Sequence, residues 1–244
     1  MDLSISYIYG EAWTFAKKNI VPFLVYSLIV GAIGIAVASC CMPSGFWSTW
    51  LDAVQGNTHA AERLTQMQTL NPMQLLQYLV SAILVVPLYN GILGVCRGIR
   101  KFDFDSVKLP ASVYCKFVLG LVLYVLIILV GAIFLLVPGI YLGIRFSQAG
   151  YYLIEHHDAS IKQAMAWSWD STRGHVLELF GLGLVGLVAL IGAMIPCIIL
   201  VAVLALFGPV GIAIGVIAIV VVAFIAQLVL YFANGMVYVT LCEK

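Results

Sequence analysis

Long apolar segments, separated by short connections, dominate this sequence of 244 residues. The chain is 63% hydrophobic and only 9% charged, whereas a soluble domain carries about 25% charged residues. Such a chain has too few polar side chains to cover a surface exposed to water, so lipid must cover it. We therefore expect an all-α fold, a polytopic membrane helix bundle.

Six segments are candidates for membrane-spanning helices, which need about 20 apolar residues each. Segment 176–207 is too long for one straight crossing, and Pro196 is expected to kink it. Gly208 and Pro209 then predict a turn into the last segment. The five segments that are long enough to cross are 20–42, 73–96, 113–137, 176–207 and 210–241.

The sixth candidate, 139–154, is short and contains Arg145. A central arginine costs about 2.5–3.5 kcal/mol on insertion scales, and each apolar side chain returns only about 0.3–0.6 kcal/mol. We expect this segment to insert only as the second arm of a hairpin with 113–137. Pro138 and Gly139 are predicted to form the hairpin turn, because proline ends a helix and glycine permits a turn.

The basic residues predict how the chain is oriented. With six spans and with both termini in the cytoplasm, Arg63 lies outside and Arg145 lies in the membrane. The remaining ten of the twelve basic residues are cytoplasmic, in agreement with the positive-inside rule. Omitting the short span would move Lys162 and Arg173 outside. The ten cytoplasmic residues are Lys17, Lys18, Arg97, Arg100, Lys101, Lys108, Lys116, Lys162, Arg173 and Lys244.

Two amphipathic segments, 2–18 and 160–173, are predicted to be helices at the cytoplasmic interface. Ser160 and Gln163 can form a capping box, and Gly174 can end the second helix. Their default role is that of structural elbows leading into spans, although such helices can also bind lipid. The interfacial residues are Trp13, Lys17, Lys18, Trp167, Trp169 and Arg173.

The chain is expected to form a single transmembrane domain over residues 1–244. Alanine–tryptophan pairs precede basic residues before the first and fifth spans, at Trp13 and Trp167. This pattern suggests an elbow followed by a hairpin, used three times over 1–96, 97–155 and 156–244. Transporters often contain repeats of this kind, and duplication also produces scaffolds.

Polar residues follow similar spacings in the fourth and last spans. At 100° per residue, each set occupies one face of a continuous helix, and polar groups that face lipid are costly. Aligning the cytoplasmic ends places Tyr141 level with Gln227, Arg145 level with Tyr231 and Gln148 level with Asn234. The two sets are Tyr141, Arg145, Gln148, Tyr152 and Glu155 in the fourth span, and Gln227, Tyr231, Asn234 and Tyr238 in the last.

Two interpretations of these stripes stay open. The first is a polar seam that lines a path for a substrate or a lipid headgroup, with Arg145 attracting an anion such as phosphate. The second is hydrogen bonding between helices, with Arg145 extending to the outer surface. The candidate ligand- or lipid-binding residues are Tyr141, Arg145, Gln148, Gln227, Tyr231 and Asn234.

No catalytic constellation and no metal site is expected. The six cysteines include no CxxC spacing, which is unfavourable for a disulfide framework or a zinc site. Residues 37–40 look like a lipoprotein cleavage box ending at Cys40, but the leader would be longer than the usual 15–30 residues or so. Glu155, His156, His157 and Asp158 are better explained as a hydrated loop than as ligands, because adjacent histidines cannot easily bind one ion.

One string carries the most specific resemblance to a known family: LLVPGIYLGIRF at 135–146, followed by AMAWS at 164–168 and TRGH at 172–175, and preceded by Arg97-Gly98 and Phe104-Asp105. This combination resembles the YciC-like bacterial membrane proteins and the membrane domain of some glycerophosphodiester phosphodiesterases. The likeness covers roughly residues 75–200. It implies a six-helix inner-membrane fold and little about activity, because catalysis in the phosphodiesterase relatives belongs to a separate soluble domain.

We therefore expect a non-enzymatic protein of the bacterial inner membrane that interacts with lipids or envelope components as a scaffold or accessory subunit. A small transporter or channel built around Arg145 is the alternative, and a lipid-modifying enzyme is a third hypothesis. No cofactor is expected, and the net charge of +1 favours no nucleic acid partner. The expected partners are membrane lipids, anionic headgroups among them, and the pattern is compatible with a homo-oligomer or with other membrane proteins.

Overall fold

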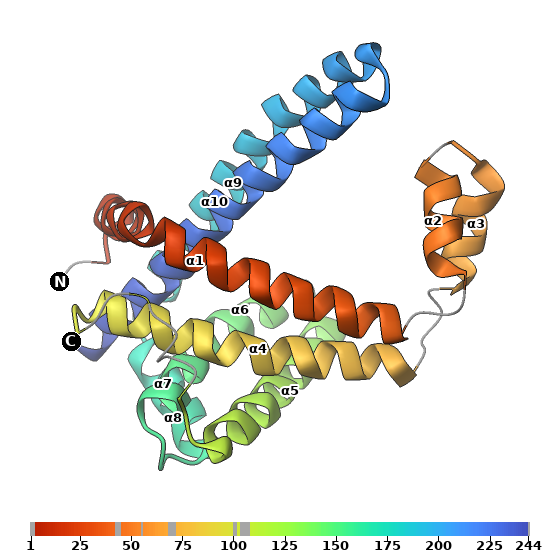
Figure 1. The fold of residues 1–244 in the computed structure, drawn as a ribbon. Coiled ribbons are helices and arrows are strands. Elements are labelled where there is room, and N and C mark those ends of the chain that lie inside the picture. Colours follow the sequence, from red (N-terminus) through yellow and green to blue (C-terminus); the bar gives the residue numbers. More distant parts are fainter. Residues whose placement is uncertain are drawn as a thin grey trace. The chain divides into compact units, whose positions relative to one another are not determined.

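The computed structural model describes residues 3–41, 45–54, 56–67, 72–99, 102 and 108–243, and these residues are helical without any strand. Some residues named above lie outside this part of the chain. They are the basic residues Arg100, Lys101 and Lys244, and Phe104 and Asp105 of the family resemblance. The helices (Figure 1) are α1 (Ile5–Cys41), α2 (Phe46–Val54), α3 (Thr58–Met67), α4 (Pro72–Cys96), α5 (Ala111–Phe134), α6 (Leu136–Phe146), α7 (Ala149–Glu155), α8 (Ile161–Ser171), α9 (Val176–Leu204) and α10 (Pro209–Cys242), with the 3-10 turn η2 (Ala205–Phe207) before α10.

Five of the described helices are long and apolar enough to cross a membrane. Many of their large apolar side chains are exposed on the protein surface, as expected where lipid rather than water is the solvent. The prediction of five long apolar helices is therefore confirmed. These candidate membrane spans are Ile5–Val37, Gln77–Cys96, Ala111–Ile133, Val176–Leu204 and Ile214–Cys242.

The chain forms two compact units, one of residues 1–23 and 86–244 and the other of residues 24–85. In the second unit, α2 and α3 pack against each other as a short hairpin. Tyr26 and Leu84 also belong to this unit, and the Tyr26 hydroxyl donates a hydrogen bond to the Leu84 carbonyl. The first unit holds every residue of the candidate site described below.

The predicted interfacial segment 2–18 is not a separate helix in the structure. Its described residues form the start of α1, which continues without interruption into the first span. Ile8, Ala12 and Ala16 are buried on one face, as the amphipathic pattern predicted, whereas Ile5 is exposed.

The turn between α9 and α10 agrees with the sequence prediction. Gly208 adopts a φ of 77°, which glycine tolerates because it has no Cβ. Pro209 occupies the first position of α10, where its missing N–H is not needed. The two helices then run side by side as an antiparallel pair, drawn in blue in Figure 1.

The hairpin between α5 and α6 forms as expected, but its turn lies at Leu135 rather than at Pro138 and Gly139. Leu135 is extended, with φ −166° and ψ 147°, and separates the two helices. Pro138 belongs to the first turn of α6, where a backbone N–H has no helical partner. Gly139 lets the helices approach closely, because a Cβ there would lie 3.0 Å from the backbone nitrogen of Ala132.

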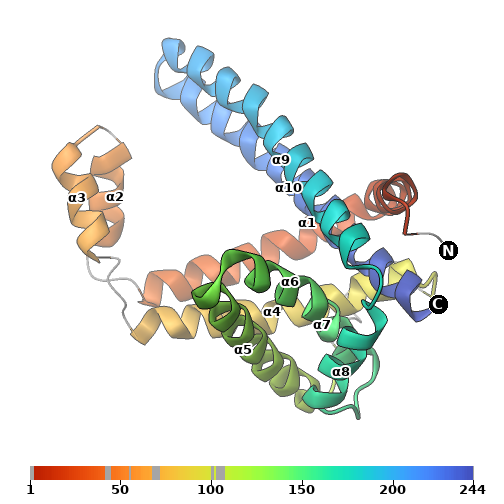
Figure 2. The same ribbon diagram turned by 180° about the vertical axis from the view of Figure 1, so that it is seen from behind.

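Helix α8 has the predicted ends. The Ser160 side chain accepts a hydrogen bond from the Gln163 N–H, and the Gln163 side chain accepts one from the Ser160 N–H, which completes the capping box. After the helix, Gly174 adopts a φ of 86°. In Figure 2, α7 and α8 lie beside the starting end of α5, and all three helices are in contact.

Candidate functional site

Arg145 is the central residue of the candidate site. It lies in the last turn of α6, and only 3% of its surface is exposed. Its guanidinium carbon is 4.0 Å from the centre of the Trp169 ring on α8 and 5.8 Å from the centre of the Tyr141 ring one turn earlier on α6. The two rings are nearly perpendicular and form two walls around the cation.

Side chains of α8 bond to the backbone at the break between α6 and α7 and so hold Arg145 against α8. The Ser168 hydroxyl donates a hydrogen bond of 2.8 Å to the Arg145 carbonyl and accepts one of 3.3 Å from the Gln148 N–H. The Thr172 hydroxyl lies 3.4 Å from the same carbonyl. These side chains satisfy backbone groups that the interrupted helix leaves without partners. The face of α8 that carries Ser168 and Thr172 therefore packs on protein.

No carboxylate in the described part of the chain forms an ion pair with Arg145. Within that same part of the chain, the buried Arg145 Nε has no hydrogen-bond partner. A buried charge needs an opposite charge or several hydrogen bonds to offset its desolvation, and a ring face offsets only about 2 kcal/mol. The site is therefore chemically suited to an anion.

Two adjacent cavities lie beside the α6–α7 break. One, of about 300 Å³, is lined by both Gln148 and Asn234, so these two residues come together as the stripes predicted. The other, of about 250 Å³, shares Tyr124, Ser147 and Asn234 with it. Arg145 lines neither cavity.

The remaining residues of the proposed seam are not brought together in one path. Tyr141 is 40% exposed, and Gln227 is also exposed. Tyr231 uses its carbonyl to accept a hydrogen bond of 3.4 Å from the Tyr151 hydroxyl. A continuous helix would have kept the first stripe on one face, but the turn at Ser147 and Gln148 divides it. Arg145 does not extend to the protein surface, since it is buried and its guanidinium lies against the Trp169 ring.

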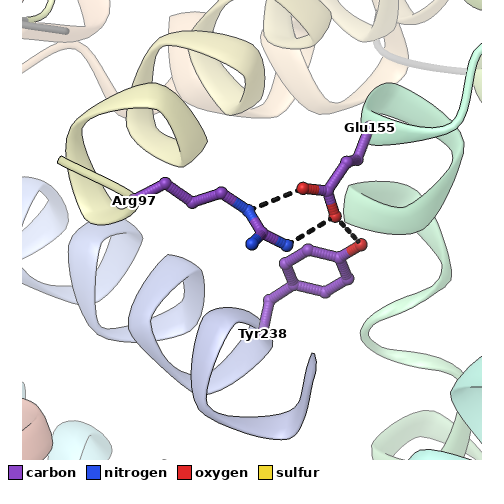
Figure 3. A network of polar contacts seen from close by, with 3 residues as sticks. All are labelled: Arg97, Glu155 and Tyr238. Atoms are coloured by element: carbon purple, nitrogen blue, oxygen red, sulfur yellow. Dashed lines mark hydrogen bonds and ion pairs between the residues drawn. The ribbon is translucent and has the colours of Figure 1, made fainter. Parts of the chain in front are cut away.

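The ion pair at the end of α7 (Figure 3) was not predicted from the sequence. The Arg97 Nε lies 2.6 Å from the Glu155 Oε1, and the Arg97 Nη2 donates a hydrogen bond of 2.8 Å to the Glu155 Oε2. The Tyr238 hydroxyl donates a hydrogen bond of 2.5 Å to the same Oε2. Partial burial lowers the pKa of Arg97, but the Glu155 carboxylate outweighs it and holds this pKa above its ordinary value. Glu155 and Tyr238 were both on the predicted stripes, whereas nothing linked Arg97 to them.

The predicted interfacial residues have different surroundings. Lys17 places its ammonium 4.8 Å from the centre of the Trp13 ring, and Lys18 and Arg173 are exposed. The Trp167 ring stacks on Tyr152 at 5.0 Å and packs against Tyr238 at 5.1 Å. Of these interfacial residues, Trp169 is the one whose ring lies over the Arg145 cation.

The histidine- and carboxylate-rich loop after α7 shows no grouping of metal ligands. His156 stacks on Tyr152 with 4.2 Å between ring centres, and His175 Nδ1 lies 2.8 Å from Glu178 Oε2. Among the described residues, no three His, Cys, Asp or Glu side chains are placed to hold one ion.

No family model matches this chain, and no significant match was found among curated proteins or among solved structures. The geometry of the site is therefore the main guide to function.

Proposed function

We propose that this chain is a non-enzymatic protein of the bacterial inner membrane that binds an anionic lipid headgroup at Arg145 and acts as a scaffold or accessory subunit. The proposal also includes six membrane crossings with both termini in the cytoplasm. It further includes membership of the YciC-like proteins that the sequence resembles. The observation that carries it is the burial of Arg145 between Trp169 and Tyr141, with no acidic partner among the described residues.

Contacts at the end of α7 support the sixth crossing. Lys116, early in α5, donates a hydrogen bond of 2.8 Å from Nζ to the carbonyl of His157. Glu155 pairs with Arg97, the residue after α4. Helices α6 and α7 together therefore lead back to the end where α5 begins, although neither is long enough to cross alone.

The route to Arg145 supports a headgroup as the ligand. Tyr141 forms one wall of the site and is 40% exposed, so an anion can approach past its ring. The opposite wall is Trp169, and tryptophan is enriched at headgroup depth in membranes. A phosphate oxygen would complete the hydrogen bonding of the Arg145 guanidinium, which is suited to such groups.

The transporter alternative has less support. It depends on Arg145 facing a path for solutes, and Arg145 lines neither of the two cavities beside the helix break.

Lipid binding by the full-length protein tests the proposal. Native mass spectrometry would compare retention of phosphatidylglycerol and phosphatidylcholine by the wild type and by Arg145→Gln. Loss of charge-assisted hydrogen bonds worth about 1.5–3 kcal/mol should weaken phosphatidylglycerol retention about tenfold or more. Lys162→Gln is the matched control, since Lys162 is exposed on α8. An equal loss in the control, or unchanged retention in Arg145→Gln, would contradict the headgroup site.

A further inference from the structure

Gln148, which lines the larger of these two cavities, carries a buried polar atom that no described group satisfies. Gln148 is 2% exposed, and its Oε1 has no hydrogen-bond partner within the described part of the chain. Its Nε2 donates to the Ser147 Oγ at 3.1 Å, so the amide is held by one end only. A buried acceptor without a partner is unfavourable, so we expect a ligand that donates a hydrogen bond.

The donor groups of the other polar side chains around this cavity already have partners. The Tyr9 hydroxyl donates to the Leu182 carbonyl at 2.8 Å, and the Tyr124 hydroxyl donates to the Gly143 carbonyl at 3.1 Å. The Asn234 Nδ2 donates to a carbonyl one turn earlier in α10. Among the described residues, Gln148 Oε1 is therefore the buried side-chain acceptor of this lining that stays unpaired.

The lining excludes a charged ligand. No lysine, arginine, histidine, aspartate or glutamate borders either cavity, and most of the lining is apolar. A charged group placed there would lose its hydration without gaining a counter-charge. The volume of about 300 Å³ is at the lower end of the range found for small-molecule sites.

We propose that this cavity binds a neutral amphiphile, such as a medium-chain alcohol or a short monoacylglycerol, whose hydroxyl donates a hydrogen bond to Gln148 Oε1. The hydrocarbon chain lies against the apolar walls formed by α6, α9 and α10. This site is separate from the anion site, because Arg145 does not border it.

The test is a titration of the full-length protein in lipid nanodiscs with 1-decanol and, separately, with decane. The side-chain amide resonance of Asn234, which also lines the cavity, reports binding by NMR. The Gln148 amide resonance, identified by its absence in Gln148→Leu, should shift with decanol and not with decane. Decanol should bind about fivefold more weakly to Gln148→Leu than to the wild type, as expected for the loss of one hydrogen bond.

Two further variants keep the test decisive. Gln227→Leu makes the same replacement at an exposed position of α10 and should leave decanol binding unchanged. Gly183→Leu fills the cavity, since a Cβ at Gly183 meets no atom within 4 Å, and it should abolish binding even if Gln148→Leu fails to fold. Equal affinities for decanol and decane would overturn the proposal. The same holds if decanol shifts the amide resonances no more than an equal volume of water does. Full binding in Gly183→Leu would also overturn it.

Discussion

Arg97 and Glu155 form a bidentate ion pair between the residue that follows α4 and the last residue of α7, with Nε to Oε1 at 2.6 Å and Nη2 to Oε2 at 2.8 Å. Their side chains are 28% and 21% exposed, so solvent screens the pair only in part. The contact connects segments separated by the whole α5–α6 hairpin, and it fixes where the return arm of that hairpin ends.

Breaking this pair should destabilise the protein. We expect Glu155→Gln to lower the free energy of unfolding by about 1–3 kcal/mol, because Arg97 loses its charged acceptor. Arg97→Gln should cost a similar amount, and the double variant should cost less than the sum of the two. Unfolding in detergent micelles measures this cycle. Additive losses would show that the two charges do not interact.

Trp169 should stabilise Arg145 through its ring face. Trp169→Ala removes that face and should lower the free energy of unfolding by about 1–3 kcal/mol. Trp169→Phe keeps an aromatic ring beside the cation and should lower the free energy of unfolding by less. Thermal unfolding of the purified variants provides the comparison. A larger decrease in stability for Trp169→Phe than for Trp169→Ala would contradict a cation–π role.

Ser168 should be the most sensitive hydroxyl of α8. Ser168→Ala leaves the Gln148 N–H without its buried partner and the Arg145 carbonyl with only its longer contact to Thr172, at a cost of about 1–3 kcal/mol. Ser171→Ala is the matched control, because the Ser171 hydroxyl bonds only to its own helix and should cost much less. Chemical unfolding of both variants tests this difference, and equal costs would show that Ser168 does not hold the break.

Gly139 should not tolerate alanine. The added Cβ would lie 3.0–3.2 Å from backbone and Cβ atoms of Ala132, so α5 and α6 would have to separate, at a cost of about 1–3 kcal/mol. Gly10→Ala is the control: its Cβ meets nothing within 4 Å, and alanine favours the helix by about 1 kcal/mol. Unfolding measurements should therefore give opposite signs for the two variants. A neutral Gly139→Ala would contradict the close approach.

Six crossings can be checked by labelling single cysteines in a variant without native cysteines. The substitutions are Asp158→Cys, Leu206→Cys and Glu243→Cys, and the reagent is a maleimide that cannot cross membranes. The cysteine at 206 should react in intact cells, whereas those at 158 and 243 should react only after the inner membrane is opened. Reaction at position 158 from outside would overturn the proposed topology.

Sequence patterns predicted the local features of the fold well. The five long apolar helices, the Gly208–Pro209 turn, the Ser160–Gln163 capping box and the left-handed Gly174 all follow from composition or from neighbouring residues. The α5–α6 hairpin was also expected, but its turn was assigned to the wrong residues. Proline is tolerated in the first turn of a helix, so Pro138 could begin α6 rather than end α5.

The candidate site was predicted only in part. Gln148 and Asn234 line one cavity, as their matching spacings predicted. That prediction, however, assumed one continuous helix through 139–154. The break at Ser147 and Gln148 divided that face, and Ser168, twenty residues away in the chain, holds the break.

The sequence by itself determined which segments are apolar enough to leave water and where a local signal such as the Ser160–Gln163 capping box or the Gly208–Pro209 turn begins or ends a helix, because hydrophobicity and capping depend on residues close together in the chain. Only the tertiary structure decided that Trp169 covers Arg145 and that Glu155 meets Arg97. Those pairs form because packed helices bring distant residues within reach, and spacing along one helix carries no information about which neighbour it will contact.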